Sequence, residues 1–101
     1  MKTEQFNFII QNMLQHCTDT LTNKAKEYAT EDRLHNFKIA ATLQGITPIQ
    51  ALAGMMSKHT VSVYDMCQGG ECPLDMWDEK IGDSINYLLL LRALVEDKLT
   101  K

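Results

Sequence analysis

The spacing of apolar residues along the chain predicts helices and no strands. In the first third of the chain, apolar side chains return every three or four positions, which matches the 3.6-residue turn of an amphipathic helix. These positions are Phe6, Ile10, Met13, Leu14, Cys17, Leu21, Ala25 and Tyr28. No segment alternates apolar and polar residues for long, as a half-buried strand would. The pattern predicts an all-α chain whose first helix covers about residues 4–29.

A short second helix is predicted over residues 34–43, after the polar interruption TEDR. Asp32 is a candidate N-cap, because an aspartate side chain can accept a hydrogen bond from a free N–H of the first turn. Gly45 stands where a left-handed residue would end the helix.

The third helix has the clearest start signal in the chain. Thr47 is a candidate N-cap, Pro48 occupies the first helical position, where its missing N–H costs nothing, and Gln50 completes a capping-box pattern. We expect this helix to run to about residue 66.

A loop and a long final helix complete the chain. The stretch CQGGECPLD, residues 67–75, contains paired glycines and a proline and predicts a loop, and the last helix is expected over residues 76–97 with Asp75 as its N-cap. Short connections between the helices favour a compact bundle of three long helices and one short helix, in a single domain over residues 1–101.

The last helix is apolar on two sides and carries a polar stripe within one of them. One side comprises Trp77, Ile81, Ile85, Leu88 and Val95. The other comprises Leu90 and Leu94, in the same sector as Glu79, Asp83 and Asn86. A helix of this kind in so small a chain is either the centre of the bundle or a subunit interface. We expect it to be both, in a homo-oligomer that is a dimer or larger.

Composition excludes several classes of partner. Hydrophobic residues make up 45% of the chain and charged residues 23%, which is typical of a folded globular protein. The net charge is −3 and no Lys/Arg cluster is present, so we expect no nucleic-acid partner. Because neither a membrane-length apolar run nor a signal peptide is seen, no membrane partner is expected. The three cysteines are then predicted to be reduced, in the cytoplasm.

The third and fourth helices are expected to pack antiparallel, which would bring two polar faces together. These faces comprise Lys58, Ser62 and Asp65 on the third helix and Glu79, Asp83 and Asn86 on the fourth. Gathered carboxylates bind Mg²⁺, and a lysine beside them can hold phosphate, so the cluster would suit pyrophosphate hydrolysis of a nucleotide. The alternative is that both faces are solvated ridges, with ordinary ion pairs between Lys58 and Asp65 or Glu79.

Two cysteine-based sites are weaker alternatives. Cys67 and Cys72 stand five residues apart, with His59 two turns earlier, but a zinc site normally has a closer pair and four ligands. Cys17 lies on the apolar stripe of the first helix, which disfavours a nucleophile.

Several motifs in fixed order resemble a family of small phage and prophage proteins from bacteria. The motifs are Lys-x-x-Glu-Tyr, Asn-Phe, Thr-Pro, Lys-His and Glu-Lys-Ile-x-Asp-x-x-Asn-Tyr, and they cover nearly the whole chain after the first turns. More remotely, the chain is similar to the all-α nucleotide pyrophosphatases, the MazG-type and dimeric dUTPase-like enzymes. Those bundles hold Mg²⁺ with acidic residues and cleave nucleoside triphosphates to monophosphate and pyrophosphate.

The resemblance implies roles for individual residues. Glu79 and Asp83 would be catalytic and would hold Mg²⁺ together with Asp65 and Glu27. The substrate contacts would be Lys58 and Ser62 at the phosphates and Asn86 and Tyr87 at the sugar or base. The family's Glu-Glu-x-x-Glu helix is absent, and Lys80 stands three residues before Asp83, where the family has glutamate.

Three functions are therefore carried forward, all in the cytoplasm of a bacterial host cell. The first is Mg²⁺-dependent pyrophosphohydrolysis of a (d)NTP. The second is binding without catalysis, either as a sponge for a nucleotide or nucleotide-derived molecule or as an antagonist of a host defence protein. The third is a structural, protein–protein role in which the last helix is the interface, through Leu90 and Leu94.

Overall fold

The protein folds into four helices, in a computed structural model that describes residues 1–25 and 31–100. They are α1 (Thr3–Ala25), α2 (His35–Gln44), α3 (Pro48–Cys67) and α4 (Leu74–Leu99). The described part of the chain contains no strand, so the all-α prediction is confirmed. Every described helix boundary lies within two residues of its predicted place, whereas the expected end of the first helix lies outside the described residues.

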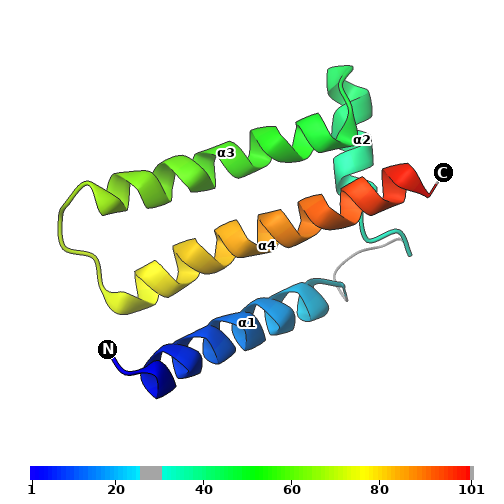
Figure 1. The fold of residues 1–101 in the computed structure, drawn as a ribbon. Coiled ribbons are helices and arrows are strands. Elements are labelled where there is room, and N and C mark those ends of the chain that lie inside the picture. Colours follow the sequence, from blue (N-terminus) through cyan, green and yellow to red (C-terminus); the bar gives the residue numbers. More distant parts are fainter. Residues whose placement is uncertain (26–30, 101) are drawn as a thin grey trace.

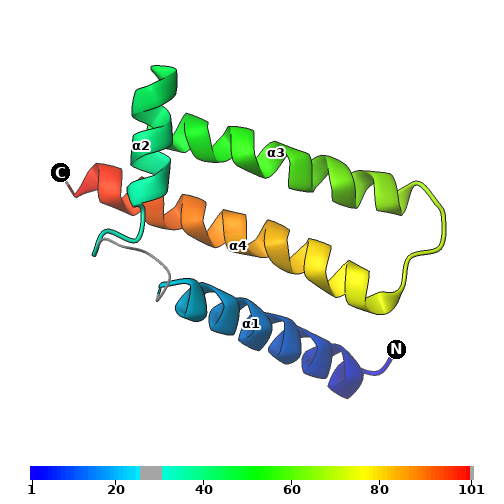
Figure 2. The same cartoon turned by 180° about the vertical axis from the view of Figure 1, so that it is seen from behind.

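The three long helices lie side by side, with α4 in the middle (Figure 1). The same order is seen from behind (Figure 2), with α1 along one side of α4 and α3 along the other. The loop over residues 68–73 turns the chain so that α3 and α4 run antiparallel, as predicted, while α1 runs parallel to α4. Among the described helices, α1 contacts only α4, and α2 crosses the end of the layer against α3. The bundle is therefore an open layer built around α4.

The predicted start of α3 and end of α2 are confirmed in atomic detail. The Gln50 N–H donates to Oγ1 of Thr47 at 3.1 Å, and the Thr47 N–H donates to Oε1 of Gln50 at 3.0 Å. Gly45 ends α2 with φ 69° and ψ 34°, a left-handed conformation that costs glycine nothing. Local capping chemistry thus places the tight turn between α2 and α3.

The other two predicted caps are wrong by two residues each. The N-cap of α2 is Leu34, and Asp32 accepts the Leu34 N–H at 2.9 Å in the turn before the helix. Helix α4 begins directly after Pro73, so Asp75 lies inside its first turn and does not precede it. Both aspartates still accept backbone N–H groups near a helix start, because a carboxylate can do so from either side of the cap position.

The hydrophobic core is small and lies where α2, α3 and α4 meet. Its buried members are Leu34, Phe37, Leu52 and Leu94. Leu90 packs against this cluster, so the Leu90–Leu94 side of α4 is the one that faces the interior. The expectation that Leu90 and Leu94 form a subunit interface is therefore wrong, because the core of one subunit already buries Leu94. The prediction that α4 is the centre of the bundle is confirmed. No described helix is both long enough and apolar enough to cross a membrane.

The contact between α1 and α4 is closest at a cysteine and a glycine. Cys17 is 1% exposed, and its Sγ lies 3.8 Å from the carbonyl oxygen of Gly82. Burial, together with the negative charge of Asp83, raises the pKa of the Cys17 thiol. The thiol is therefore held protonated at neutral pH, which agrees with the expectation that Cys17 is no nucleophile.

Truncation of the central core residue should destabilise the fold strongly. Leu52 is fully buried, so Leu52→Ala is expected to lower the free energy of unfolding by about 2–5 kcal/mol through lost burial and a cavity. Leu43 is 81% exposed, so the control Leu43→Ala should change it by less than about 0.5 kcal/mol. Urea denaturation followed by circular dichroism measures both, and equal effects would contradict the placement of the core.

The thiols should differ in reactivity. At pH 7–8, we expect iodoacetamide to modify exposed Cys67 quickly and buried Cys17 only when the protein unfolds, because the raised pKa and the burial both suppress its thiolate. Because the pKa of the Cys17 thiol is raised, a higher pH should be needed to form its thiolate than for an ordinary cysteine. Peptide mass spectrometry over time measures this, and early modification of Cys17 in folded protein would show that α1 detaches from α4.

Candidate functional site

A cavity of about 180 Å³ lies beside α4 on its interior side, with every helix contributing to its wall. The lining residues are Thr20 and Leu21 of α1, Arg33, Asn36 and Phe37 in and before α2, Met55 of α3, and Asp83, Asn86, Tyr87 and Leu90 of α4. Asp83, Asn86 and Tyr87 lie together because residues three and four apart share one face of a helix. Three of the predicted site residues therefore meet in one cavity.

His59 is the α3 residue that faces Asp83. Its Nδ1 lies 3.7 Å from Oδ2 of Asp83, and the two side chains are 20% and 35% exposed. The His59 ring also packs on the ring of Tyr87, with centroids 4.9 Å apart. Sequence reasoning had expected Lys58 here. His59 and Lys58 both lie one turn after Met55, which lines the cavity, so the spacing in the sequence does not favour one over the other.

Asn86 is the buried polar residue of this wall. It is 9% exposed, and its Oδ1 is buried without a hydrogen-bond partner in the described structure. An unsatisfied buried acceptor costs about 1–3 kcal/mol. A ligand could donate a hydrogen bond to this oxygen only after the wall shifted to expose it, and Asn86 is the indication of a binding site on which the hypothesis depends.

Arg33 places a positive charge in the same wall. Its Nη2 donates to the carbonyl oxygen of Leu21 at 3.0 Å, which ties the turn before α2 to α1. The guanidinium is half-buried and lines the cavity together with the carboxylate of Asp83. This residue was missed from the sequence, where it belonged only to a polar break between two helices.

Glu79 points to a different place from Asp83. Its side chain is exposed and lines a second cavity, between the middle of α1 and the start of α4, with His16 and Met13 among its neighbours. The two residues are four apart and so lie on one side of α4. However, their neighbours differ. Glu79 lies beside residues of α1, whereas Asp83 lies beside His59 of α3.

No hydrogen bond or ion pair in the described part of the chain joins the remaining predicted site residues to Asp83. Lys58 and Asp65 are exposed on α3, Ser62 is half-buried, and Glu27 lies outside the described residues. In the ranges 1–25 and 31–100, no three His, Cys, Asp or Glu side chains are grouped so that they could hold a metal ion. The predicted Mg²⁺ ligand set stays a prediction, and among its described members only Asp83 lines the cavity.

Cys67, at the end of α3, and Cys72, in the loop that follows, offer no better metal site. Cys67 is exposed, Cys72 is half-buried, and both are free thiols. His59, the expected third ligand, instead contacts Asp83 and Tyr87. The zinc alternative therefore receives no support from the described residues.

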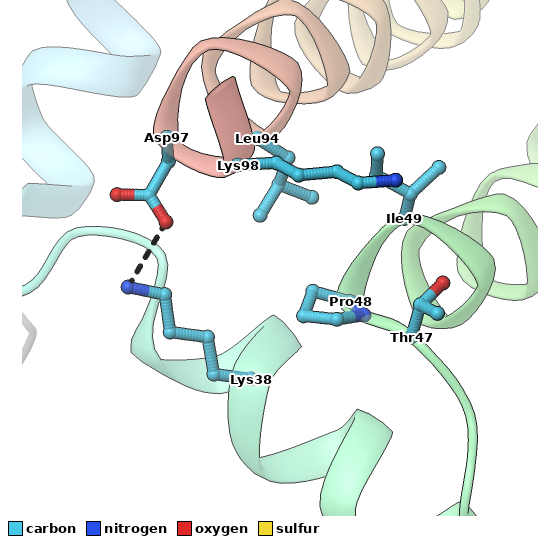
Figure 3. A pocket seen from close by; sticks show the side chains of 7 residues that line it. All are labelled: Lys38, Thr47, Pro48, Ile49, Leu94, Asp97 and Lys98. Atoms are coloured by element: carbon cyan, nitrogen blue, oxygen red, sulfur yellow. Dashed lines mark ion pairs between the residues drawn. The ribbon is translucent and has the colours of Figure 1, made fainter. Parts of the chain in front are cut away.

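A third cavity, of about 220 Å³, lies between the start of α3 and the end of α4 (Figure 3). Pro48, Ile49 and Leu94 form its apolar part. Lys38, at its edge, pairs with Asp97 at 3.4 Å and with Asp32 at 2.7 Å. Lys38 is therefore paired within the fold, and Lys98 is the other cation that lines this cavity.

Comparison with known proteins adds no functional information. No protein-family model, curated protein sequence or solved structure matches the chain. The geometry around Asp83, Asn86 and Arg33 is therefore the basis on which a function can be proposed.

Proposed function

We propose that the protein binds a nucleotide or a nucleotide-derived molecule in the cavity at Asn86, and that it acts through binding. The observation that carries this proposal is the buried, unpaired Oδ1 of Asn86 in a wall of mixed polarity. Small-molecule sites typically combine apolar side chains with a small number of polar groups, and these polar groups fix the orientation of the ligand.

The size of the cavity favours partial enclosure of the ligand. Its volume of about 180 Å³ is below the roughly 300–1,000 Å³ of pockets that enclose drug-sized molecules. A base or sugar would fill it, donating to Asn86 and packing on Phe37 and Tyr87. The phosphates would stay at the mouth, where Arg33 supplies a positive charge suited to phosphate oxygens.

Binding is favoured over hydrolysis because Asp83 is the one described acid of the predicted Mg²⁺ ligand set that lines the cavity. Asp83 is the residue that would hold Mg²⁺. When bound, this ion would neutralise charge on the phosphates, and it is commonly held by one or two carboxylates together with substrate oxygens. Glu79 and Asp65, the other described acids of the predicted set, lie elsewhere. Pyrophosphohydrolysis of a (d)NTP remains the second candidate because Asp83 lines the same cavity as Asn86.

The resemblance to phage and prophage proteins supports the proposal that such a binder acts inside a bacterial host cell. In the cytoplasm of a bacterial host, a homo-oligomer present in excess would lower the free concentration of a nucleotide signal by mass action. An antagonist that binds a host defence protein directly is the alternative within the same setting.

Removal of the unpaired acceptor should lower the affinity for nucleotides without lowering the stability of the fold. Asn86→Leu keeps the side-chain size, so the melting temperature should stay the same or rise, because an unsatisfied amide is lost. Nucleotide affinity should fall by roughly 5- to 150-fold, the equivalent of about 1–3 kcal/mol. Calorimetry with a panel of ribo- and deoxyribonucleotides measures the affinity. The control Asn12→Leu, in the Glu79 cavity, should bind as the wild type does. Wild-type protein that binds no nucleotide would contradict the proposal.

Asp83 distinguishes the two candidate functions. If the protein acts by binding, wild-type protein with Mg²⁺ should release no pyrophosphate from any (d)NTP. Asp83→Asn should then tighten binding of nucleotides without Mg²⁺ by about fivefold, through loss of about 1 kcal/mol of charge repulsion. Asp65→Asn, on the exposed face of α3, is the matched control. Turnover that Asp83→Asn abolishes while the protein stays folded would identify an enzyme instead.

A further inference from the structure

We propose that the outward face of α4 packs antiparallel against the same face of a second copy of the chain. The face, called here the outer stripe, consists of Trp77, Ile81, Ile85, Leu88 and Val95. This inference concerns assembly and does not depend on nucleotide binding, because the outer stripe and the cavity lie on different sides of α4.

The outer stripe is apolar and is only partly covered within one subunit, where Trp77 and Ile85 are half-buried. Leu88 is 55% exposed, Ile81 38% and Val95 36%. Leu88 lies about 120° around the helix from Leu94, the residue that α4 buries in the core. Since α1 and α3 pack on the two sides of α4 (Figure 1), neither covers the outer stripe fully.

The exposed area of the subunit is large enough to need a partner. The chain exposes 7528 Å², whereas a folded monomer of 11.5 kDa is expected to expose about 5,800 Å². The excess of about 1,700 Å² exceeds the roughly 800 Å² that each partner buries in an interface of standard size. The radius of gyration agrees, at 15.7 Å against about 13 Å for a compact domain of this length.

The charges that flank the outer stripe favour a second copy as the partner. A two-fold interface must be complementary to itself. Asp78 and Arg92 are both exposed, and each lies seven residues from Ile85, on opposite sides of it. Antiparallel pairing centred on Ile85 would therefore set each Arg92 opposite the partner's Asp78, twice in the dimer. Within the subunit, Arg92 lies 3.4 Å from Glu96. Because this ion pair is largely exposed, it would compete only weakly with a pair between Arg92 and the partner's Asp78.

The mass of the protein in solution tests the outer stripe. At about 10–100 µM, sedimentation or light scattering should give twice the chain mass of 11.5 kDa for the wild type. Leu88→Glu should give the monomer mass, with an unchanged helical circular dichroism spectrum because this side chain is exposed in the subunit. Val61→Glu, 58% exposed on α3, is the control and should remain a dimer. A monomeric wild type, or a Leu88→Glu variant with the wild-type dimer affinity, would overturn the proposal.

A charge exchange tests the antiparallel pairing. Asp78→Arg should weaken the dimer at least tenfold at low salt, and Asp78→Arg combined with Arg92→Asp should restore it. Failure of the double variant to recover would overturn this pairing. The Asn86→Leu variant should keep the dimer while losing nucleotide affinity, so failure of the assembly proposal and failure of the binding proposal give different results.

Discussion

The packing of α4 between two other helices is the constraint on which the structure depends. A chain of 101 residues buries too little surface for a large core, so one helix must supply most of the contacts. Helix α4 does so with Leu94 in the main core and with Gly82 beneath Cys17. All contacts of α1 with other described helices pass through α4, so loosening of α4 would release both sides of the layer at once.

The same position of α4 explains the chemistry of the cavity. Its residues Asp83 and Asn86 line a cavity to which α1, α2 and α3 also contribute side chains. Asn86 is buried there with an unpaired Oδ1, whereas Asp83 is 35% exposed and lies 3.7 Å from His59. A protein selected for stability alone would gain by replacing Asn86 with an apolar residue of the same size. Retention of a polar group at such a cost is typical of sites that bind a ligand, where stability is exchanged for recognition.

The two proposed activities use opposite sides of one helix. The interior side carries the cavity, and the outer stripe would carry the second subunit. Because α4 is a continuous helix, packing of a second copy on the outer stripe would hold Asp83 and Asn86 in place without contacting them. The dimer would also enclose apolar surface that one subunit leaves in water, which is the larger part of its expected stabilisation.

Local chemistry accounts for the helices, and tertiary packing accounts for the site. Helical periodicity and the Thr47–Gln50 capping box depend on residues close in sequence, so the element boundaries and the spacing of Asp83, Asn86 and Tyr87 could be predicted from the chain alone. The rotation of α3 against α4 depends on side-chain packing between distant segments, and it places His59 rather than Lys58 beside Asp83. Arg33 reaches the cavity only because its turn docks on α1. A helical wheel shows which residues share a face, but only the packing of neighbouring helices determines what that face meets.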